Sequence, residues 1–103
     1  MDEFSWFVGL YEGEGSLVMN RGRWPNMCLK LDMTDEDTIE RASKFLGVSY
    51  RPYGPYGSSK KVWYRTKKQG GRKSGLYDLL MKMRPYLSKR RQEQIDKRIE
   101  ELG

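Results

Sequence analysis

The stretch FVGLYEGEG, residues 7–15, joins the end of a predicted helix to the start of a predicted strand. Apolar side chains recur at helical spacing between residues 2 and 12, namely Phe4, Phe7, Val8 and Tyr11. The glycines at positions 13 and 15 disfavour helical conformation and predict that the helix ends there. The chain therefore opens with a predicted amphipathic helix, and its end carries two acidic residues, Glu12 and Glu14, each followed by a glycine.

A second stripe of the same predicted helix consists of small residues. Ser5, Gly9 and Gly13 recur every four residues, which allows another backbone to approach closely. Each glycine costs the helix roughly 1 kcal/mol relative to alanine. We therefore expect a tightly packed partner on this stripe, either a second copy of the chain or, as the alternative, an ordinary helix of the same chain.

Downstream of this helix, strand and helix patterns alternate. The predicted elements are strands at 16–21 and 27–33, a helix capped by Thr34 and stopped by Gly47, strands at 48–53 and 61–67 joined by a Gly/Pro/Ser-rich loop, a flexible basic connection at 69–73, and helices on either side of Pro85. This order predicts one α+β domain over residues 1–103, αββαββα plus a C-terminal helix. Helices would cover one face of a four-stranded antiparallel sheet and leave the other face to a partner.

The residue types exclude several kinds of site. The 103 residues contain no histidine and one cysteine, Cys28, so neither a disulfide within the chain nor a Cys/His zinc site can form. Acid and base chemistry would depend on carboxylates, lysine, tyrosine or metal-bound water. We expect any metal to be Mg²⁺ on oxygen ligands, with Mn²⁺ as its substitute, and no small-molecule cofactor.

Positive charge is concentrated in the second half of the chain. The net charge is +6, and residues 51–91, here called the basic block, hold thirteen Lys and Arg against one acid, Asp78. Aromatic residues interleave with these cations, as expected of a surface that binds nucleic-acid phosphates. A solvated basic face is the alternative. No apolar run reaches the length of a membrane span, and we expect no membrane partner and a soluble, intracellular protein.

Residues 7–15 resemble the motif of the LAGLIDADG homing endonucleases: Gly9, Leu10 and Gly15 agree with it, and Glu12 and Glu14 replace aspartates. The TDED-led helix and the segment MRPYL, residues 83–87, also resemble that family, so the resemblance covers nearly the whole chain. It implies a site-specific, metal-dependent endonuclease for double-stranded DNA. Because the chain carries one motif, it also implies a homodimer that packs through Ser5, Gly9 and Gly13.

The resemblance also implies the catalytic residues. Glu14 would hold the metal, Asp35 would approach the centre, and Lys89 and Arg90 would deliver positive charge to it. Arg90 stands where the family usually has lysine and is a poor proton shuttle, so plain phosphate contact is an equal alternative for this basic group. Independently, two carboxylates at the C-terminal end of a helix oppose the helix dipole, and a cation would relieve this conflict. Solvated glutamates are the alternative.

We expect DNA bases to be recognised by the sheet face that the helices leave open. If Leu17, Met19, Leu29 and Leu31 face the core, the alternate residues face outward. The predicted DNA-contacting residues are Ser16, Asn20, Asn26, Lys30, Asp32, Arg65, Lys67 and, at the last helix, Arg91. Asp32 has two interpretations, a partner for cytosine or a charge partner for Lys30. A non-cleaving DNA- or RNA-binding protein of the same fold, such as a regulator or a splicing factor, remains the second functional hypothesis.

Overall fold

The computed structural model describes residues 1–58 and 60–103; residue 59, in the loop predicted between the third and fourth strands, lies outside the described residues. The elements are α1 (Glu3–Glu14), β1 (Gly15–Asn20), β2 (Asn26–Met33), α2 (Glu36–Leu46), β3 (Tyr50–Tyr53), β4 (Trp63–Gly70), α3 (Gly75–Met83), a 3-10 turn η1 (Arg84–Tyr86) and α4 (Lys89–Glu101). The strands form one antiparallel sheet in the order β1-β2-β4-β3. The predicted α+β architecture is confirmed.

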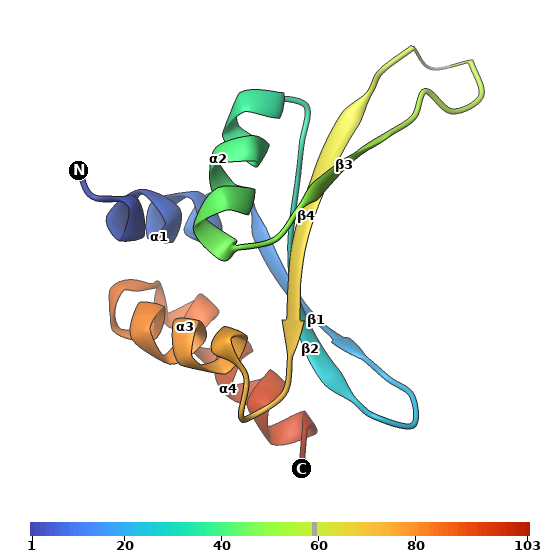
Figure 1. Cartoon of the computed structure of the whole chain (residues 1–103). Helices are drawn as coiled ribbons and strands as arrows, with labels where there is room; N and C mark the ends of the chain where they lie inside the picture. The colour runs from blue at the N-terminus through green and yellow to red at the C-terminus, as the bar shows by residue number, and fades with distance from the viewer. Residues whose placement is uncertain (59) are drawn as a thin grey trace.

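All four α-helices lie on the same side of the sheet, and its other side is bare (Figure 1). The core fills the space between sheet and helices, with Leu17, Leu29 and Leu31 fully buried as predicted and Met19 packed at its margin. From the helices, the fully buried side chains are Phe7, Tyr11, Ile39, Ala42, Leu76, Leu80, Met83 and Ile95. Among the described residues, no helix is both long and apolar enough to cross a membrane.

The end of α1 depends on a glycine. Asp2 caps the start of the helix by accepting a 2.7 Å hydrogen bond from the Ser5 amide. At the other end, a Cβ on Gly15 would lie 2.3 Å from a ring carbon of Tyr11, so the fully buried Tyr11 ring fits only beside a residue without a side chain. Gly15 therefore fixes the point at which the chain leaves α1 and enters β1.

Two predicted boundaries are corrected at α2. The N-cap is Asp35 rather than Thr34, because the Asp35 carboxylate accepts from the Thr38 amide at 3.3 Å. The helix ends as predicted at Gly47, whose φ of 72° is left-handed. The predicted strand at 48–53 begins only at Tyr50, because the Val48 amide still bonds to the Ser43 carbonyl and completes the end of the helix.

The fourth strand starts and ends later than the predicted range 61–67, because β4 begins at Trp63. β4 continues to Gly70, where Gln69 and Gly70 pair with Cys28 and Met27 of the long strand β2. Part of the connection predicted at 69–73 is therefore strand. Ser74 then caps α3, Pro85 lies in η1, and Ser88 caps α4, so the interruption predicted at Pro85 separates two helices as expected.

Candidate nucleic-acid interface and acidic centre

The sheet surface without helices, here called the free face, carries most of the predicted DNA-contacting residues. Residues directly opposite each other in an antiparallel sheet project from the same face. The register therefore aligns rows across the free face: Asn20 with Asn26, Ser16 with Lys30 and Lys67, and Asp32 with Arg65 and Arg51. The structure thus brings seven of the eight predicted residues to one surface, and their contact with DNA stays a prediction.

The row nearest the β3–β4 hairpin contains an ion pair that the sequence did not predict. Asp32 accepts from Arg65 Nε at 2.7 Å and from Nη2 at 3.1 Å, and this raises the pKa of the guanidinium. The predicted pairing of Asp32 with Lys30 is wrong, because Arg65 lies directly opposite Asp32 in the register. Tyr53 and Trp63 stack beside the pair with ring centroids 4.6 Å apart.

The free face also has a basic hollow of about 260 Å³ at its β3 edge. Its charged lining consists of Arg51, Arg65 and Lys67, and no acidic residue lines it. At the opposite end of the sheet, the Asn20 amide donates to the Asn26 side chain at 3.0 Å. The free face therefore carries cations toward its β3 edge and polar amides at its other end, which suits contacts to both phosphates and base edges.

Glu14 lies where α1 reaches the sheet, and its side chain is exposed. An open hollow of about 510 Å³ is lined by Glu14 together with Asp32, Thr34, Met33 and Trp63. Asp35 does not line this hollow, because its carboxylate caps α2. In the described parts of the chain, no group of three or more His, Cys, Asp or Glu residues could hold a metal ion. One chain therefore offers Glu14 as a single uncommitted acid at this point.

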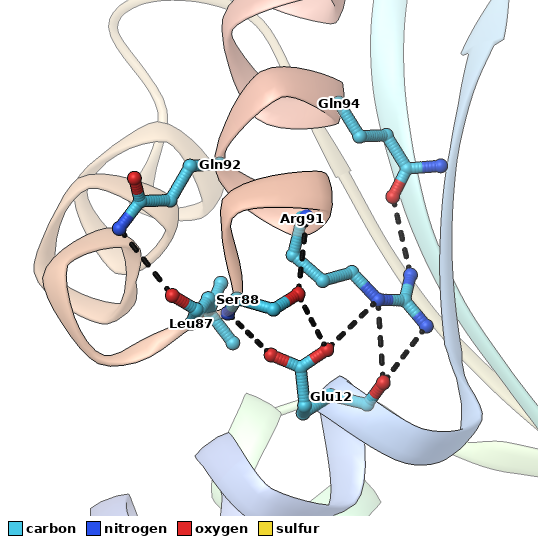
Figure 2. Close-up of polar contacts among 6 residues, drawn as sticks. All are labelled: Glu12, Leu87, Ser88, Arg91, Gln92 and Gln94. Atoms are coloured by element: carbon cyan, nitrogen blue, oxygen red, sulfur yellow. Dashed lines mark hydrogen bonds and ion pairs between the residues drawn. The ribbon is translucent and has the colours of Figure 1, made fainter.

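Glu12 joins α1 to the start of α4 (Figure 2). Its carboxylate accepts from the Ser88 amide and, at 3.0 Å, from the Ser88 hydroxyl. The Ser88 amide is the largest cause of the lowered pKa of Glu12, and the positive charges of Arg91 and Arg90 lower this pKa further. Glu12 thus stabilises the helix junction.

Arg91 is part of this junction and not of the DNA-facing surface. It is 5% exposed, and its Nε and Nη2 donate to the Glu12 carbonyl at 3.3 and 3.2 Å (Figure 2). Its Nη1 donates to Gln94, and the guanidinium lies 5.0 Å from the centroid of the Tyr11 ring. The DNA contact predicted for Arg91 is therefore wrong for this arrangement, because the protein encloses the charge. Lys89 and Arg90, which directly precede Arg91 in the first turn of the same helix, are exposed.

The small-residue stripe of α1 has no cover from its own chain. Ser5, Gly9 and Gly13 are exposed, and a Cβ built on either glycine would meet nothing within 4 Å. The alternative of a tight helix contact within the chain is wrong for the described residues. Beside the stripe, Phe4 and Tyr86 form an edge-to-face pair, and both line a further hollow with Ser5 and Val8.

The sequence analysis missed Ser88 and the Tyr53–Trp63 stack. Ser88 carries a cap signal, since it directly precedes a helical run. The stack depends on strand register: Tyr53 lies opposite Trp63 at the end of the β3–β4 ladder, and the sequence showed only that aromatic residues interleave with cations.

The fold has a counterpart among solved structures. The archaeal intron-encoded homing endonuclease I-Vdi141I, in complex with DNA, matches with a TM-score of 0.62 and 14% sequence identity. The match covers 90% of this chain and 62% of that endonuclease, so the chain spans less than two thirds of its length. No family model matches the sequence, and no curated protein does. The likeness shows the fold: the α+β architecture expected from the resemblance to homing endonucleases is the one this chain adopts.

Proposed function

We propose that the chain is one subunit of a homodimeric, metal-dependent endonuclease that cuts double-stranded DNA. The observation that carries the proposal is the position of Glu14, an exposed acid at the end of a helix whose small-residue stripe is exposed, beside a sheet face that carries cations. The homing endonuclease of similar fold is described in complex with DNA, which supports the same class of partner. A twisted antiparallel ribbon of this kind fits the major groove.

Assembly would complete the acidic centre. A single Glu14 gives a metal ion one carboxylate, and Mg²⁺ binds in proteins through one or two carboxylates together with water and substrate phosphate. Two chains packed along Ser5, Gly9 and Gly13 would bring two Glu14 carboxylates to their common axis. The donor type suits Mg²⁺ or Mn²⁺, and a bound divalent ion supplies activated water and stabilises the leaving oxygen.

The chain's own residues would position the phosphates around this centre. Lys89 and Arg90 are exposed at the start of α4, which the Glu12–Ser88 contact holds against the end of α1. Their charges would stabilise the negative charge that develops on phosphate oxygens. Asp35 is assigned a role outside the centre, because its carboxylate is committed to the cap of α2.

The second candidate is a DNA- or RNA-binding protein of the same fold that does not cleave. It is favoured by the single uncommitted acid at the hollow and by Arg90, which does not deprotonate at accessible pH. The two candidates share the free face and differ in the need for Glu14. A test of Glu14 therefore separates them.

The test is incubation with a randomised duplex library and Mg²⁺, followed by sequencing of the bound and the cut fractions. The Glu14→Gln variant keeps the side-chain size and removes the charge, so we expect cleavage to collapse. Binding should persist or tighten, because two carboxylates near the axis repel phosphates when metal is absent. The matched control is Glu93→Gln, at an exposed glutamate of α4. Equal cutting by Glu14→Gln and wild type would refute the site, and binding without cutting in Mg²⁺ or Mn²⁺ would favour the second candidate.

A further inference from the structure

The charges of the free face are of two kinds. Lys67 and Arg51 line the basic hollow, and their side chains are exposed. Arg65 lines the same hollow, but it is bonded to Asp32 through two nitrogens, and only 26% of its side chain is exposed. The pair as a whole carries no net charge. Arg65 and its neighbours should therefore contribute to DNA binding in different ways.

The Arg65 guanidinium is held in one orientation. Asp32 fixes it from one edge, while the rings of Trp63 and Tyr53 lie 5.0 and 5.2 Å from its central carbon. Those rings are themselves stacked, with 12° between their planes. An arginine held by a bidentate carboxylate and two aromatic rings has little freedom to follow a phosphate, but it can present a fixed pattern of donors.

The donors that remain on Arg65 suit a two-acceptor partner. A guanidinium carries five N–H groups in one plane. Asp32 accepts one N–H from Nε and one from Nη2, so three remain, and the Tyr53 hydroxyl is a further partner of the guanidinium. In the major groove, guanine presents two acceptors, O6 and N7, at the spacing that such a fork matches. The neighbouring carboxylate repels a charged phosphate more strongly than it repels the uncharged base edge.

We infer that Arg65 is the guanine-reading residue of the free face and that Asp32 is its positioning residue, whereas Lys67 supplies charge without reading sequence. The inference rests on the proposed binding of duplex DNA and specifies which base one position of the target must hold. Asp32 acts through Arg65: it holds the fork in place and cancels the charge that would otherwise attract any phosphate.

The test compares selected binding sites and salt dependence for four proteins: wild type, Arg65→Lys, Asp32→Asn and the control Lys67→Gln. Wild type should enrich a guanine at one position of each half-site. Arg65→Lys keeps the charge but loses the fork, so discrimination at that position should fall by about 5- to 150-fold while the salt slope stays the same. Lys67→Gln should lower the salt slope by about one and keep the guanine.

Asp32→Asn separates positioning from a merely structural ion pair. It leaves the Arg65 charge uncompensated, so the salt slope should rise by about one while guanine discrimination weakens. Thermal melting checks that each variant folds. In the selected site, replacing the guanine with 7-deazaguanine, which lacks N7, should weaken wild-type binding. Inosine, which keeps O6 and N7, should not weaken it.

The outcomes separate this inference from the proposed function. One result would overturn the inference and leave DNA binding intact: wild type binds duplex DNA and Lys67→Gln lowers its salt slope, but the selected sites contain no guanine whose enrichment depends on Arg65. A rise in salt slope for Asp32→Asn without loss of guanine discrimination would overturn the positioning role. Absence of any salt-dependent duplex binding would overturn both the proposed function and the inference.

Discussion

Replacing Arg91 with methionine tests whether the junction of α1 and α4 is structural. The change keeps an unbranched apolar stem beside Tyr11 but removes the donors to the Glu12 carbonyl and to Gln94. A buried acceptor left without its donor costs about 1–3 kcal/mol, and a buried cation–π contact adds up to roughly 2 kcal/mol. The Glu12 carboxylate keeps its two bonds from Ser88 and can reach water, which limits the loss.

We therefore expect Arg91→Met to lower the free energy of unfolding by about 3 kcal/mol, with a decrease in Tm of roughly 12–24 °C for a domain of this size. Differential scanning calorimetry measures both quantities. The matched control is Lys89→Met, an exposed cation of the same turn, which should change the free energy by less than about 0.5 kcal/mol. Equal stability of the two variants, together with a reduced salt slope for DNA binding in Arg91→Met, would refute the structural role and restore Arg91 to the DNA-facing set.

Three further outcomes follow from other contacts. Gly9→Leu should abolish dimers in sedimentation without destabilising the folded chain, because a side chain there meets nothing within 4 Å and leucine favours a helix more than glycine does; a dimeric variant would exclude this stripe as the interface. Gly15→Ala should lower the free energy of unfolding by about 1–3 kcal/mol, because the added methyl group collides with the Tyr11 ring. Its control, Gly13→Ala, lies in open space and should raise the free energy of unfolding of the isolated chain by roughly 0.5–1 kcal/mol. Equal melting temperatures of the two variants would contradict the packing at Gly15. The folded-state pKa of Glu12 is lowered, so its carboxylate stabilises the fold at pH values above its ordinary pKa of 4.5, and this stabilisation is lost as the pH falls through the folded-state pKa. In urea titrations, Glu12→Gln should therefore lose less stability toward acid pH than wild type.

The alternation of apolar and polar residues, together with the helix-capping residues, was sufficient to predict the order of helices and strands and the position of the free face. Leu17 and Met19 lie two residues apart in β1, as Leu29 and Leu31 do in β2, so their inward orientation also placed Ser16, Lys30 and Asp32 on the opposite side of the sheet. The Asp32–Arg65 pair could not be predicted in this way. It joins residues 33 positions apart, and it depends on the register between β2 and β4, which no local pattern encodes.

The error at Arg91 has a different cause. Lys89, Arg90 and Arg91 are chemically alike, and only their helical phase distinguishes them. Arg91 lies four residues after Leu87 and four before Ile95, both buried, so the helical period places it on the apolar face of α4. That signal was present in the sequence, but burial of a cation is rare enough that composition outweighed it. The N-cap of α2 shows an intrinsic ambiguity instead, because Thr34 and Asp35 are both good caps.

The thirteen cations of the basic block overstate the charge available to a nucleic acid. Arg65, Arg84 and Arg91 each face a carboxylate, and Lys68 and Arg72 donate to backbone carbonyls at helix ends. Charges committed in this way release few counterions when DNA binds, so they add little to the salt-dependent part of the affinity. Their contribution is geometric instead. The contact with Asp32 orients Arg65 on the free face, and the contact of Arg91 with Glu12 holds α4 against the end of α1. Specificity and cleavage by the proposed endonuclease would depend on these placements more than on total charge.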